Sequence, residues 1–391
     1  MKILIVSSYF PPHVGGVEVV AQQQAAALAD AGHTVVVGTS RTGETQAHRE
    51  RREGYDIVRL PVSNLLERRT GVPYPLIGPA FWRGLAALVA WCDVVHVHDV
   101  LYQPPQLAAL LARRAGKPMY VTQHAGRVRH HNPVVLAAAR LSAAVARRFI
   151  WDGARRVVAH NALVADYLSA QGVAEDRVVR APSGIDTVAF APGAPGDGHR
   201  IRQRFGLPAG VPLVLFVGRL VRQKGYQELV AAADSAYHVV LAGTGQPERP
   251  LPAGVSFIGP VERADLIALY RLADVFVLPA TGEIFPLAVQ EAMACGLPVV
   301  TTYDHRYDAY DLDRELICLV QPRAEELRRA VLTVLADEEL RRRMGEHSRR
   351  FAVEHFDRRI NQAVVTRMYD EDLGMSEDRN EEHPCPSVSS S

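Results

Sequence analysis

The sequence predicts an α/β protein built from two doubly wound domains. Short runs of β-branched and aliphatic residues recur along the 391 residues and are separated by stretches of helical length. Such runs lack the alternation of a strand with one solvent-facing side, so they indicate buried parallel strands. A break rich in proline and glycine near residues 183–200 divides the series, after which the pattern begins again. We therefore expect two Rossmann-like domains facing each other across a cleft, which is the natural place for a ligand.

Each domain is expected to contain five strands. In the first domain, residues 1–185, they are 3–6, 35–37, 94–97, 119–121 and 157–159; in the second, residues 200–350, they are 213–217, 239–242, 255–258, 275–278 and 299–301. Apolar residues at 17, 21, 25 and 28 predict a first helix, which Gly32 would end. A C-terminal helix over 351–373 is expected to pack back toward the first domain, and the polar tail 374–391 is expected to be disordered.

The composition excludes several classes of protein. With 48% hydrophobic and 22% charged residues, the chain is not a disordered or collagen-like protein. It has 44 Lys and Arg against 43 Asp and Glu, and this balance argues against a dedicated nucleic-acid binder. The four cysteines, Cys92, Cys295, Cys318 and Cys385, form no CxxC pair, which argues against structural zinc and against a secreted disulfide framework.

No membrane span or targeting signal is expected. The N-terminal residues fit a first strand better than a signal peptide. The longest mostly apolar stretch, 80–92, contains Arg83 and is shorter than the roughly 20 residues that a span requires. We therefore expect a cytoplasmic protein.

A glycine pair lies between the first strand and the first helix. Gly15 and Gly16 allow the backbone to approach an anion at the positive end of a helix, although an ordinary turn explains them equally well. No G-x-G-x-x-G follows a strand, and this absence disfavours a dinucleotide dehydrogenase.

A cluster of cations opens the second domain. Arg219, Arg222 and Lys224 follow the strand 213–217, and the carboxyl ends of such strands face the ligand crevice of an open α/β sheet. Arg219 and Lys224 can clamp a diphosphate, each charge-assisted hydrogen bond contributing roughly 1.5–3 kcal/mol. The alternative is a solvated surface turn.

Two acidic residues flank the start of a later helix. Glu283 lies in the loop before this helix, Pro286 suits its first turn, and Glu291 lies one to two turns into it. A carboxylate buried on an apolar helix needs a partner, and sugar or ribose hydroxyls can serve. Glu283 can instead act only on the helix dipole.

Taken together, these segments resemble the retaining glycosyltransferases of family 4, which have the GT-B fold. The resemblance spans about residues 1–370. It rests on GGVE at 15–18, DVVHVHD at 93–99, YVTQHAG at 120–126, GR-x4-KG at 218–225 and the Glu-x7-Glu spacing of Glu283 and Glu291.

The resemblance implies a role for each matching residue. The catalytic group comprises His124, Glu283, Arg219 and Lys224: His124 would lie beside the hydroxymethyl and anomeric region of the donor sugar, Glu283 would contact its hydroxyls, and the two cations would hold the diphosphate. Glu291 would bind the ribose. The backbone of Ile284, Phe285 and Pro286 would lie near the sugar and phosphate, and Gly15 and Gly16 would close over the phosphates.

The implied reaction is transfer of a sugar from a nucleoside diphosphate sugar to an acceptor hydroxyl with retention of configuration. The acceptor would be a glycan, a lipid-linked molecule or a small molecule. The departing phosphate would take the acceptor's proton, and no metal or other cofactor is expected. Two alternatives stay open: an epimerase or phosphorylase of the same fold, and a non-catalytic sugar-nucleotide-binding protein.

Other features carry weaker hypotheses. Relatives often have Gly-Gly-x-x-Glu after the strand 299–301, whereas residues 301–307 read TTYDHRY here, and their role stays open. Asp311 and Asp313 match the DxD metal pattern by chance, and His130 and His131 lack further metal ligands. His96 and His98 are interpreted as core or near-site residues without a role.

A basic amphipathic stretch covers residues 133–156. It is either a sheet-covering helix or a peripheral contact with an anionic membrane surface at the inner face of the membrane.

Overall fold

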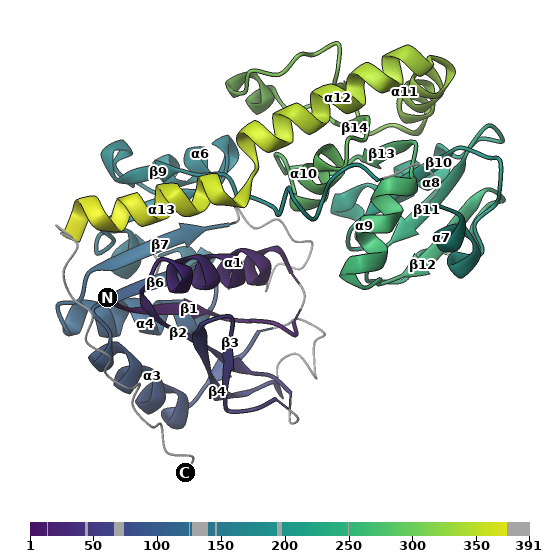
Figure 1. Ribbon diagram of the computed structural model, residues 1–391. Helices are drawn as coiled ribbons and strands as arrows, with labels where there is room; N and C mark the ends of the chain where they lie inside the picture. Colours follow the sequence, from purple (N-terminus) through teal and green to yellow (C-terminus); the bar gives the residue numbers. More distant parts are fainter. Residues whose placement is uncertain are drawn as a thin grey trace. The chain divides into compact units, whose positions relative to one another are not determined.

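The computed structural model divides the chain into two compact units (Figure 1). The first unit comprises Met1–Pro182 with Asn361–Ser391, and the second comprises Ser183–Ile360. The structure describes residues 1–13, 15–43, 46–65, 74–124, 126, 140–144, 147–193, 198–248 and 250–373. The tail 374–391, the pair His130 and His131, and much of the stretch 133–156 lie outside these residues.

The first unit is built on a mostly parallel sheet in the order β3-β4-β2-β1-β6-β7-β8-β9, with β5 pairing with β4. Only β3 and β5 run antiparallel, both to β4, among the strands described. The strands are β1 (Lys2–Ser7), β2 (Thr34–Arg41), β3 (Arg49–Arg52), β4 (Tyr55–Ser63), β5 (Leu76–Ile77), β6 (Val94–His98), β7 (Met119–Gln123), β8 (Arg156–Ala159) and β9 (Val178–Arg180).

Helices cover both faces of this sheet. Successive residues of β1 alternate between two apolar cores. Ile3 packs with residues of α1 and α13, whereas Leu4 packs with residues of α3 and α4. The α-helices are α1 (Gly16–Asp30), α3 (Pro79–Trp91), α4 (Gln103–Arg114), α6 (Ala162–Ala170) and α13 (Arg358–Leu373), with short turns η1 (Arg147–Trp151) and η2 (Glu175–Arg177). Burial on both faces explains why these strands are apolar along their whole length.

The second unit has a fully parallel sheet in the order β12-β11-β10-β13-β14-β15. Its strands are β10 (Leu213–Val217), β11 (His238–Ala242), β12 (Val255–Gly259), β13 (Val275–Leu278), β14 (Val299–Thr302) and β15 (Cys318–Val320). Its helices are α7 (Gly198–Phe205), α8 (Tyr226–Ala231), α9 (Arg263–Leu272), α10 (Leu287–Ala294), α11 (Ala324–Ala336) and α12 (Glu338–His355), with turns η3 (Arg222–Lys224) and η4 (His305–Ala309). The strand order reverses at β10, so the topological switch point lies between β10 and β13.

All ten expected strands are present, and the described residues form five further strands that were not expected. β3 consists of four charged residues, and β4 carries Arg59 and Pro61 among its buried aliphatic residues. β9 and β15 are three residues long and half-exposed, except for Arg180, which is exposed. These strands lie at or near the edges of the sheets, where the continuous apolar run of a central strand is not needed.

The expected C-terminal helix that packs onto the first unit is present as α13, but it begins at Arg358 and not at 351, because the segment 351–373 is divided between α12 and α13. Between the two helices the chain pairs with the segment that enters the second unit. Ile185 N–H donates to the carbonyl of Phe356 at 2.7 Å, and Arg358 N–H donates to the carbonyl of Ile185 at 2.8 Å. These extended-chain bonds are incompatible with a continuous helix. α13 then joins the first unit, where Met368 and Tyr369 are part of the core.

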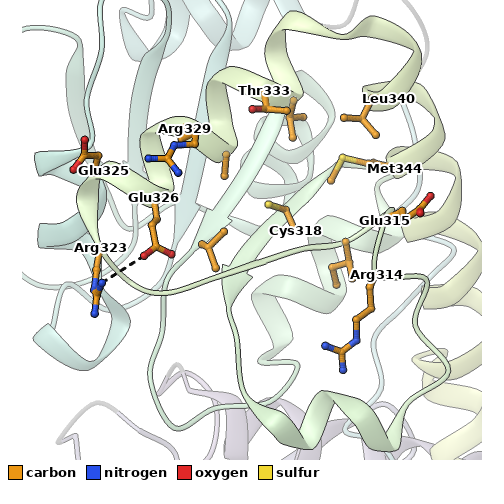
Figure 2. A pocket seen from close by; sticks show the side chains of 14 residues that line it. Arg314, Glu315, Cys318, Arg323, Glu325, Glu326, Arg329, Thr333, Leu340 and Met344 are labelled. Atoms are coloured by element: carbon orange, nitrogen blue, oxygen red, sulfur yellow. Dashed lines mark ion pairs between the residues drawn. The ribbon is translucent and has the colours of Figure 1, made fainter.

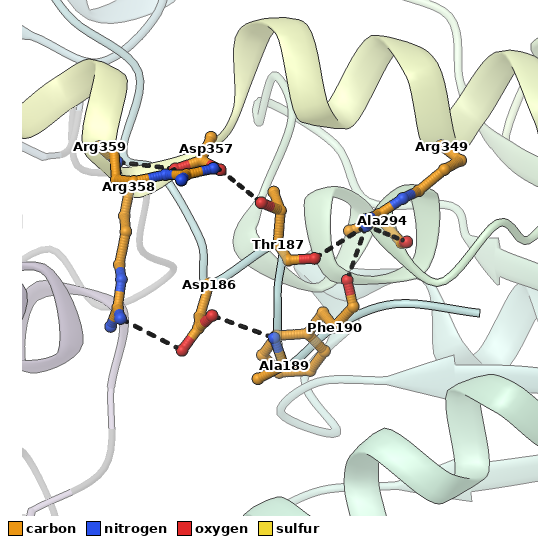
Figure 3. A network of polar contacts seen from close by, with 9 residues as sticks. All are labelled: Asp186, Thr187, Ala189, Phe190, Ala294, Arg349, Asp357, Arg358 and Arg359. Atoms are coloured by element: carbon orange, nitrogen blue, oxygen red, sulfur yellow. Dashed lines mark hydrogen bonds and ion pairs between the residues drawn. The ribbon is translucent and has the colours of Figure 1, made fainter. Parts of the chain in front are cut away.

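A polar network fixes the ends of the second unit (Figure 3). The guanidinium of Arg349 donates to the carbonyls of Thr187 and Phe190, both at 2.9 Å, and of Ala294 at 2.8 Å. The Thr187 hydroxyl donates to the Asp357 carboxylate. One side chain of α12 thus satisfies three carbonyls that no helix or strand pairs.

Candidate active site

The predicted phosphate and sugar residues of the second unit follow two neighbouring strands. Arg219 and Lys224 follow β10, and Glu283 follows β13. β10 and β13 pair in parallel, so both segments emerge at the same edge of the sheet. This edge is the switch point, where open α/β sheets bind their ligands.

Close backbone packing brings the two segments together. Gly225 has φ +72°, and a Cβ at this position would lie 2.3 Å from the carbonyl oxygen of Pro279. Only glycine therefore fits here. Beside this contact, Thr281 N–H donates to the carbonyl of Gln223 at 2.9 Å. The turn that carries Lys224 is thereby held against the loop that carries Glu283.

Lys224 and Glu283 form an ion pair with 2.6 Å between Nζ and Oε2. Their side chains are 16% and 25% exposed, so the pair is shielded but open to a ligand. Arg219 is exposed, and its guanidinium makes no ion pair or hydrogen bond with the residues that the structure describes. The edge therefore offers one cation that is already balanced, Lys224, and two exposed cations, Arg219 and Arg222, that form no ion pair with the described residues.

The loop after Glu283 contains a backbone conformation that bulky residues rarely adopt. Phe285 has φ +46°, in the left-handed region, yet it is only 4% exposed. Its carbonyl accepts a hydrogen bond from Gln290 Nε2 at 2.7 Å. Such a conformation costs roughly 1–3 kcal/mol and persists only where the surroundings enforce it.

The surroundings of Phe285 are aromatic. Its ring centroid lies 5.0 Å from Tyr307, 4.9 Å from Tyr310, 5.7 Å from Phe351 and 4.8 Å from Phe356. Each such pair contributes roughly 0.5–1.5 kcal/mol beyond its buried area. Four pairs together contribute about 2–6 kcal/mol, which is comparable to or larger than the cost of the left-handed backbone, so ring packing can offset the strain.

Glu291 lies on α10 and has a buried tyrosine as its partner. The Tyr270 hydroxyl on α9 donates to Glu291 Oε2 at 2.9 Å. Burial raises the pKa of Glu291 to about 7, while this hydrogen bond and the charge of Arg263 act in the opposite direction. The carboxyl group therefore exchanges its proton near neutral pH.

The predicted His124 of the first unit stands in a row of histidines. His98 ends β6, His124 follows β7 and His160 follows β8, and these three parallel strands are neighbours. His98 Nδ1 and His124 Nε2 are 3.0 Å apart, and the rings of His124 and His160 are 4.7 Å apart. His98 therefore contacts a predicted site residue. The sequence did not show this contact, and for that reason His98 was interpreted as a residue without a role.

These histidines are held in the neutral form. Burial lowers the pKa of His160 to about 4 and that of His96 to about 3. Burial, with repulsion from the neighbouring imidazoles, also lowers the pKa of His98 and His124 well below the ordinary value. A neutral imidazole donates through one nitrogen and accepts through the other. The bond between His98 and His124 therefore couples the tautomers of the two rings.

Gly15 and Gly16 begin α1, where a carboxylate already lies against them. A Cβ on Gly15 would lie 2.3 Å from Oε2 of Glu18, whose carboxylate folds back over the start of the helix. His13 Nδ1 lies 2.9 Å from Glu18 Oε1, so this nitrogen carries the proton and donates. The glycine at position 15 makes room for Glu18.

The structure thus joins Lys224 to Glu283 and places Arg219 at the same sheet edge, with Ile284–Pro286 leading into α10. Sequence reasoning missed Tyr270 and His160. A histidine directly after a buried strand was the available signal for His160. Tyr270 offered none, because a tyrosine on an amphipathic helix is an ordinary core residue.

Nothing in the described part of the chain forms a cluster of three His, Cys, Asp or Glu residues that can hold a metal ion. Asp311 and Asp313 are exposed in the segment before β15, and the Asp313 side chain accepts a hydrogen bond from Glu315 N–H at 3.0 Å. The two aspartates thus lie before the amino end of β15, and not at the carboxyl end of a strand, where the ligand crevice of an open α/β sheet is found. No helix within the described ranges is long and apolar enough to cross a membrane.

A cavity of about 610 Å³ lies elsewhere in the second unit, beside β15, α11 and α12 (Figure 2). None of the predicted site residues lines it. Its polar lining balances in charge: Arg314, Arg323, Arg329, Glu315, Glu325 and Glu326. The switch-point edge, and not this cavity, therefore carries the candidate chemistry.

Comparison with known proteins identifies both halves of the chain. Residues 14–189 match the family model "Glycosyltransferase Family 4", and residues 197–351 match "Glycosyl transferases group 1". A GDP-mannose-dependent alpha-mannosyltransferase of Mycolicibacterium smegmatis is 31% identical over 77% of this chain and 79% of its own length. A D-inositol 3-phosphate glycosyltransferase of Xylanimonas cellulosilytica is 35% identical over 54% of this chain, and the match spans only 55% of that relative.

Solved structures share the architecture. A sucrose-phosphate synthase from Thermosynechococcus elongatus superimposes with a TM-score of 0.77 at 23% identity, covering 96% of this chain and 100% of that one. Anabaena HepE in complex with UDP-glucose gives a TM-score of 0.75 at 20% identity, covering 95% and 100%. The family models and the relatives identify a glycosyltransferase, and the solved structures show that its fold is GT-B. Within that class, the chain belongs to glycosyltransferase family 4.

Proposed function

We propose that the protein transfers a hexosyl or related sugar from a nucleoside diphosphate sugar to an acceptor hydroxyl with retention of configuration. The observation that carries the proposal is the pair of Lys224 and Glu283 at the switch-point edge, with Arg219 exposed beside β10. A cation balanced by a carboxylate, beside a second cation that pairs with none of the described residues, suits a ligand that brings both negative charge and hydroxyl groups.

In this proposal, binding of the donor breaks the ion pair between Lys224 and Glu283, and each side chain contacts the donor instead. The diphosphate takes Lys224 and Arg219, and the carboxylate of Glu283 becomes an acceptor for hydroxyls of the sugar. The two cations then stabilise the charge that develops on the departing diphosphate, and they are in place before the reaction begins. The departing phosphate takes the acceptor's proton, so no separate base or metal ion is required.

Glu291 is proposed to bind the ribose of the donor. Its pKa of about 7 and its bond to Tyr270 leave a carboxyl group whose second oxygen can accept or donate to a ribose hydroxyl. The N–H groups of Val289 and Gln290 already donate to the carbonyl of Pro286, so those of Leu287 and Ala288 are the further donors that the start of α10 offers. Pro286 has no N–H, so these donors begin at Leu287.

The first unit is proposed to bind the acceptor and to place His124 beside the sugar. A neutral His124, coupled to His98, can hydrogen-bond a hydroxymethyl group without bringing a competing charge. Gly15 and Gly16 are proposed to approach the phosphates. This requires the Glu18 carboxylate to share or leave its place over Gly15.

The acceptor class is proposed from the relatives' names and from the sequence. One relative above is named a D-inositol 3-phosphate glycosyltransferase and the other a GDP-mannose-dependent alpha-mannosyltransferase, and the first name supports a polyol as the acceptor. The basic stretch 133–156 supports peripheral contact with the inner face of the membrane. Sedimentation with vesicles containing 30% anionic lipid tests this contact, and no binding at low salt would remove it.

The central test is Arg219→Ala, with Arg222→Ala as its matched control on the same turn. Loss of one charge-assisted bond to the diphosphate, about 1.5–3 kcal/mol, should lower kcat/KM about tenfold to a hundredfold. Arg222→Ala should change it less than threefold. Excess chelator should leave turnover intact.

Three results would contradict the proposal. The first is that a panel of nucleotide sugars gives no donor that raises Tm. The second is activity abolished by chelator and restored by magnesium or manganese. The third is turnover of the donor without any acceptor alcohol, which would indicate the epimerase or phosphorylase alternative.

A further inference from the structure

The turn after β14 supports itself independently of the loop that it touches. Asp304 caps η4, and its Oδ1 accepts from Arg306 N–H at 3.0 Å. Tyr307 N–H donates to the carbonyl of Asp304 at 3.0 Å, and Tyr310 N–H donates to that of Tyr307 at 3.1 Å. Residues 304–310 therefore form a short, internally bonded turn.

This turn presents two aromatic rings to Phe285. The Tyr307 ring meets the Phe285 ring at 86° and the Tyr310 ring meets it at 80°, both edge-to-face. Tyr307 is buried, whereas Tyr310 is half-buried. The rings of Phe351 and Phe356 are the other aromatic neighbours of Phe285 in the described part of the unit. Half of the aromatic cage thus comes from one turn.

Phe285 is the residue that redirects the chain. The backbone passes from Glu283 to the first residue of α10, Leu287, within four residues, and the left-handed conformation at Phe285 makes the change of direction. The Gln290 side chain fixes the carbonyl of Phe285 from within α10. A Phe285 that relaxed to the right-handed or extended region would move Glu283 relative to the start of α10.

We infer that Tyr307 and Tyr310 are positioning residues for glycosyl transfer. By holding the Phe285 ring they keep its backbone left-handed, and in this way they fix Glu283 relative to the first turn of α10. The inference rests on the proposed function for its effect on turnover, but the clamp itself is a property of the free protein. It also assigns a role to the segment 301–307, which departs from the family pattern.

The test compares Tyr310→Leu with Tyr310→Phe and with Tyr303→Leu. Tyr310→Phe keeps the ring. Tyr303 lies in the same segment, is 39% exposed, and has the guanidinium of Arg314 at 5.7 Å from its ring centroid, so it is the matched control. Hydrogen exchange of amides 281–289 is measured in the ligand-free protein, and kcat and KM are measured separately for donor and acceptor.

Loss of the edge-to-face contact in Tyr310→Leu should speed exchange of amides 281–289 about threefold to tenfold. It should lower kcat/KM for the donor by a similar factor and leave the acceptor KM within twofold. Tyr310→Phe and Tyr303→Leu should match wild type in both measurements. Tyr310→Met, which keeps apolar volume without the ring, serves as a second variant if Tyr310→Leu does not fold.

Unchanged exchange at 281–289 in Tyr310→Leu or Tyr310→Met would overturn the inference. Equal effects of Tyr310→Leu and Tyr303→Leu would also overturn it, because they would indicate a general loosening of the segment. If the wild-type protein transfers no sugar, the proposed function fails, and the exchange data still decide whether the clamp exists.

Discussion

Glu291→Gln tests the energetic consequence of burying a carboxyl group on α10. Burial raises the pKa of Glu291 from 4.5 to about 7. Between pH 4.5 and about pH 7, Glu291 therefore keeps its proton in the folded protein, whereas it has lost it in the unfolded chain. The stability contributed by the neutral carboxyl is therefore fully present below about pH 4.5 and is lost as the pH rises through 7. At about 1.4 kcal/mol per tenfold change in proton affinity, the loss is about 3 kcal/mol.

Glutamine cannot ionise, yet its amide oxygen can still accept the hydrogen bond of Tyr270. Its new N–H groups need a partner, and leaving one unsatisfied costs about 1–3 kcal/mol. We therefore expect Glu291→Gln to stabilise the second unit by about 1–2 kcal/mol above pH 7 and to be neutral or destabilising at pH 5. For a unit of this size, that gain corresponds to a rise in Tm of roughly 2–8 °C.

The assay is thermal unfolding of the nucleotide-free protein from pH 5 to 8.5, with Glu354→Gln at an exposed position of α12 as control. The difference in Tm between Glu291→Gln and wild type should grow up to pH 7 and then level off, whereas that of the control should stay flat. A pH-independent difference would refute the reasoning. The same substitution should weaken donor binding about tenfold and act on KM more than on kcat, since the ribose is remote from the reacting carbon.

Three further predictions follow from the contacts. Glu283→Gln frees Lys224 and should tighten the binding of a nucleoside diphosphate without sugar about threefold to tenfold in calorimetry, while turnover slows at least tenfold; weaker binding would contradict the proposed exchange of partners. In the wild type, the free energy of unfolding measured in urea should fall as the pH falls from 6.5 to 4, because the native imidazole of His160 has a lowered pKa and only the unfolded chain takes up the proton. His160→Asn should make this fall smaller; a slope against pH equal to that of the wild type would exclude His160 as its source. Arg349→Met leaves three carbonyls unpaired and should lower Tm by roughly 3–12 °C, whereas Arg350→Met, exposed on the same helix, should change it little; equal effects would exclude the network.

The fold was predictable because parallel strands buried on both faces must be apolar throughout. This constraint is strong in the middle of a sheet, as in β1 and β10, and weak at its edges. β3 needs only backbone pairing to β4, so its four charged residues give no strand signal. The division of the last helix depends on pairing with Ile185, which is distant in the sequence.

The position of the candidate site in the fold could be predicted where charged residues follow buried strands. Arg219 and Lys224 follow one such strand and Glu283 follows its neighbour, and the strand ends of a parallel sheet meet at one edge. Their roles toward a donor came from the family resemblance and stay predictions. The left-handed backbone of Phe285 was not predictable, since a phenylalanine has no local preference for it. That conformation results from rings that come from two other segments, the turn after β14 and the C-terminal end of α12.

The two units differ in the charge of their site residues, and this difference suits the proposed reaction. In the first unit, burial keeps His124 and its neighbours uncharged, so they can hydrogen-bond a sugar without competing for the proton that the departing phosphate must take. In the second unit, Glu283 neutralises Lys224, so the positive charge at the switch-point edge that no carboxylate of the described residues balances belongs to Arg219 and its neighbour Arg222. A diphosphate therefore gains two cations on binding, whereas a neutral sugar alone gains none. We therefore expect the site to favour the proposed donor over the free sugar by charge.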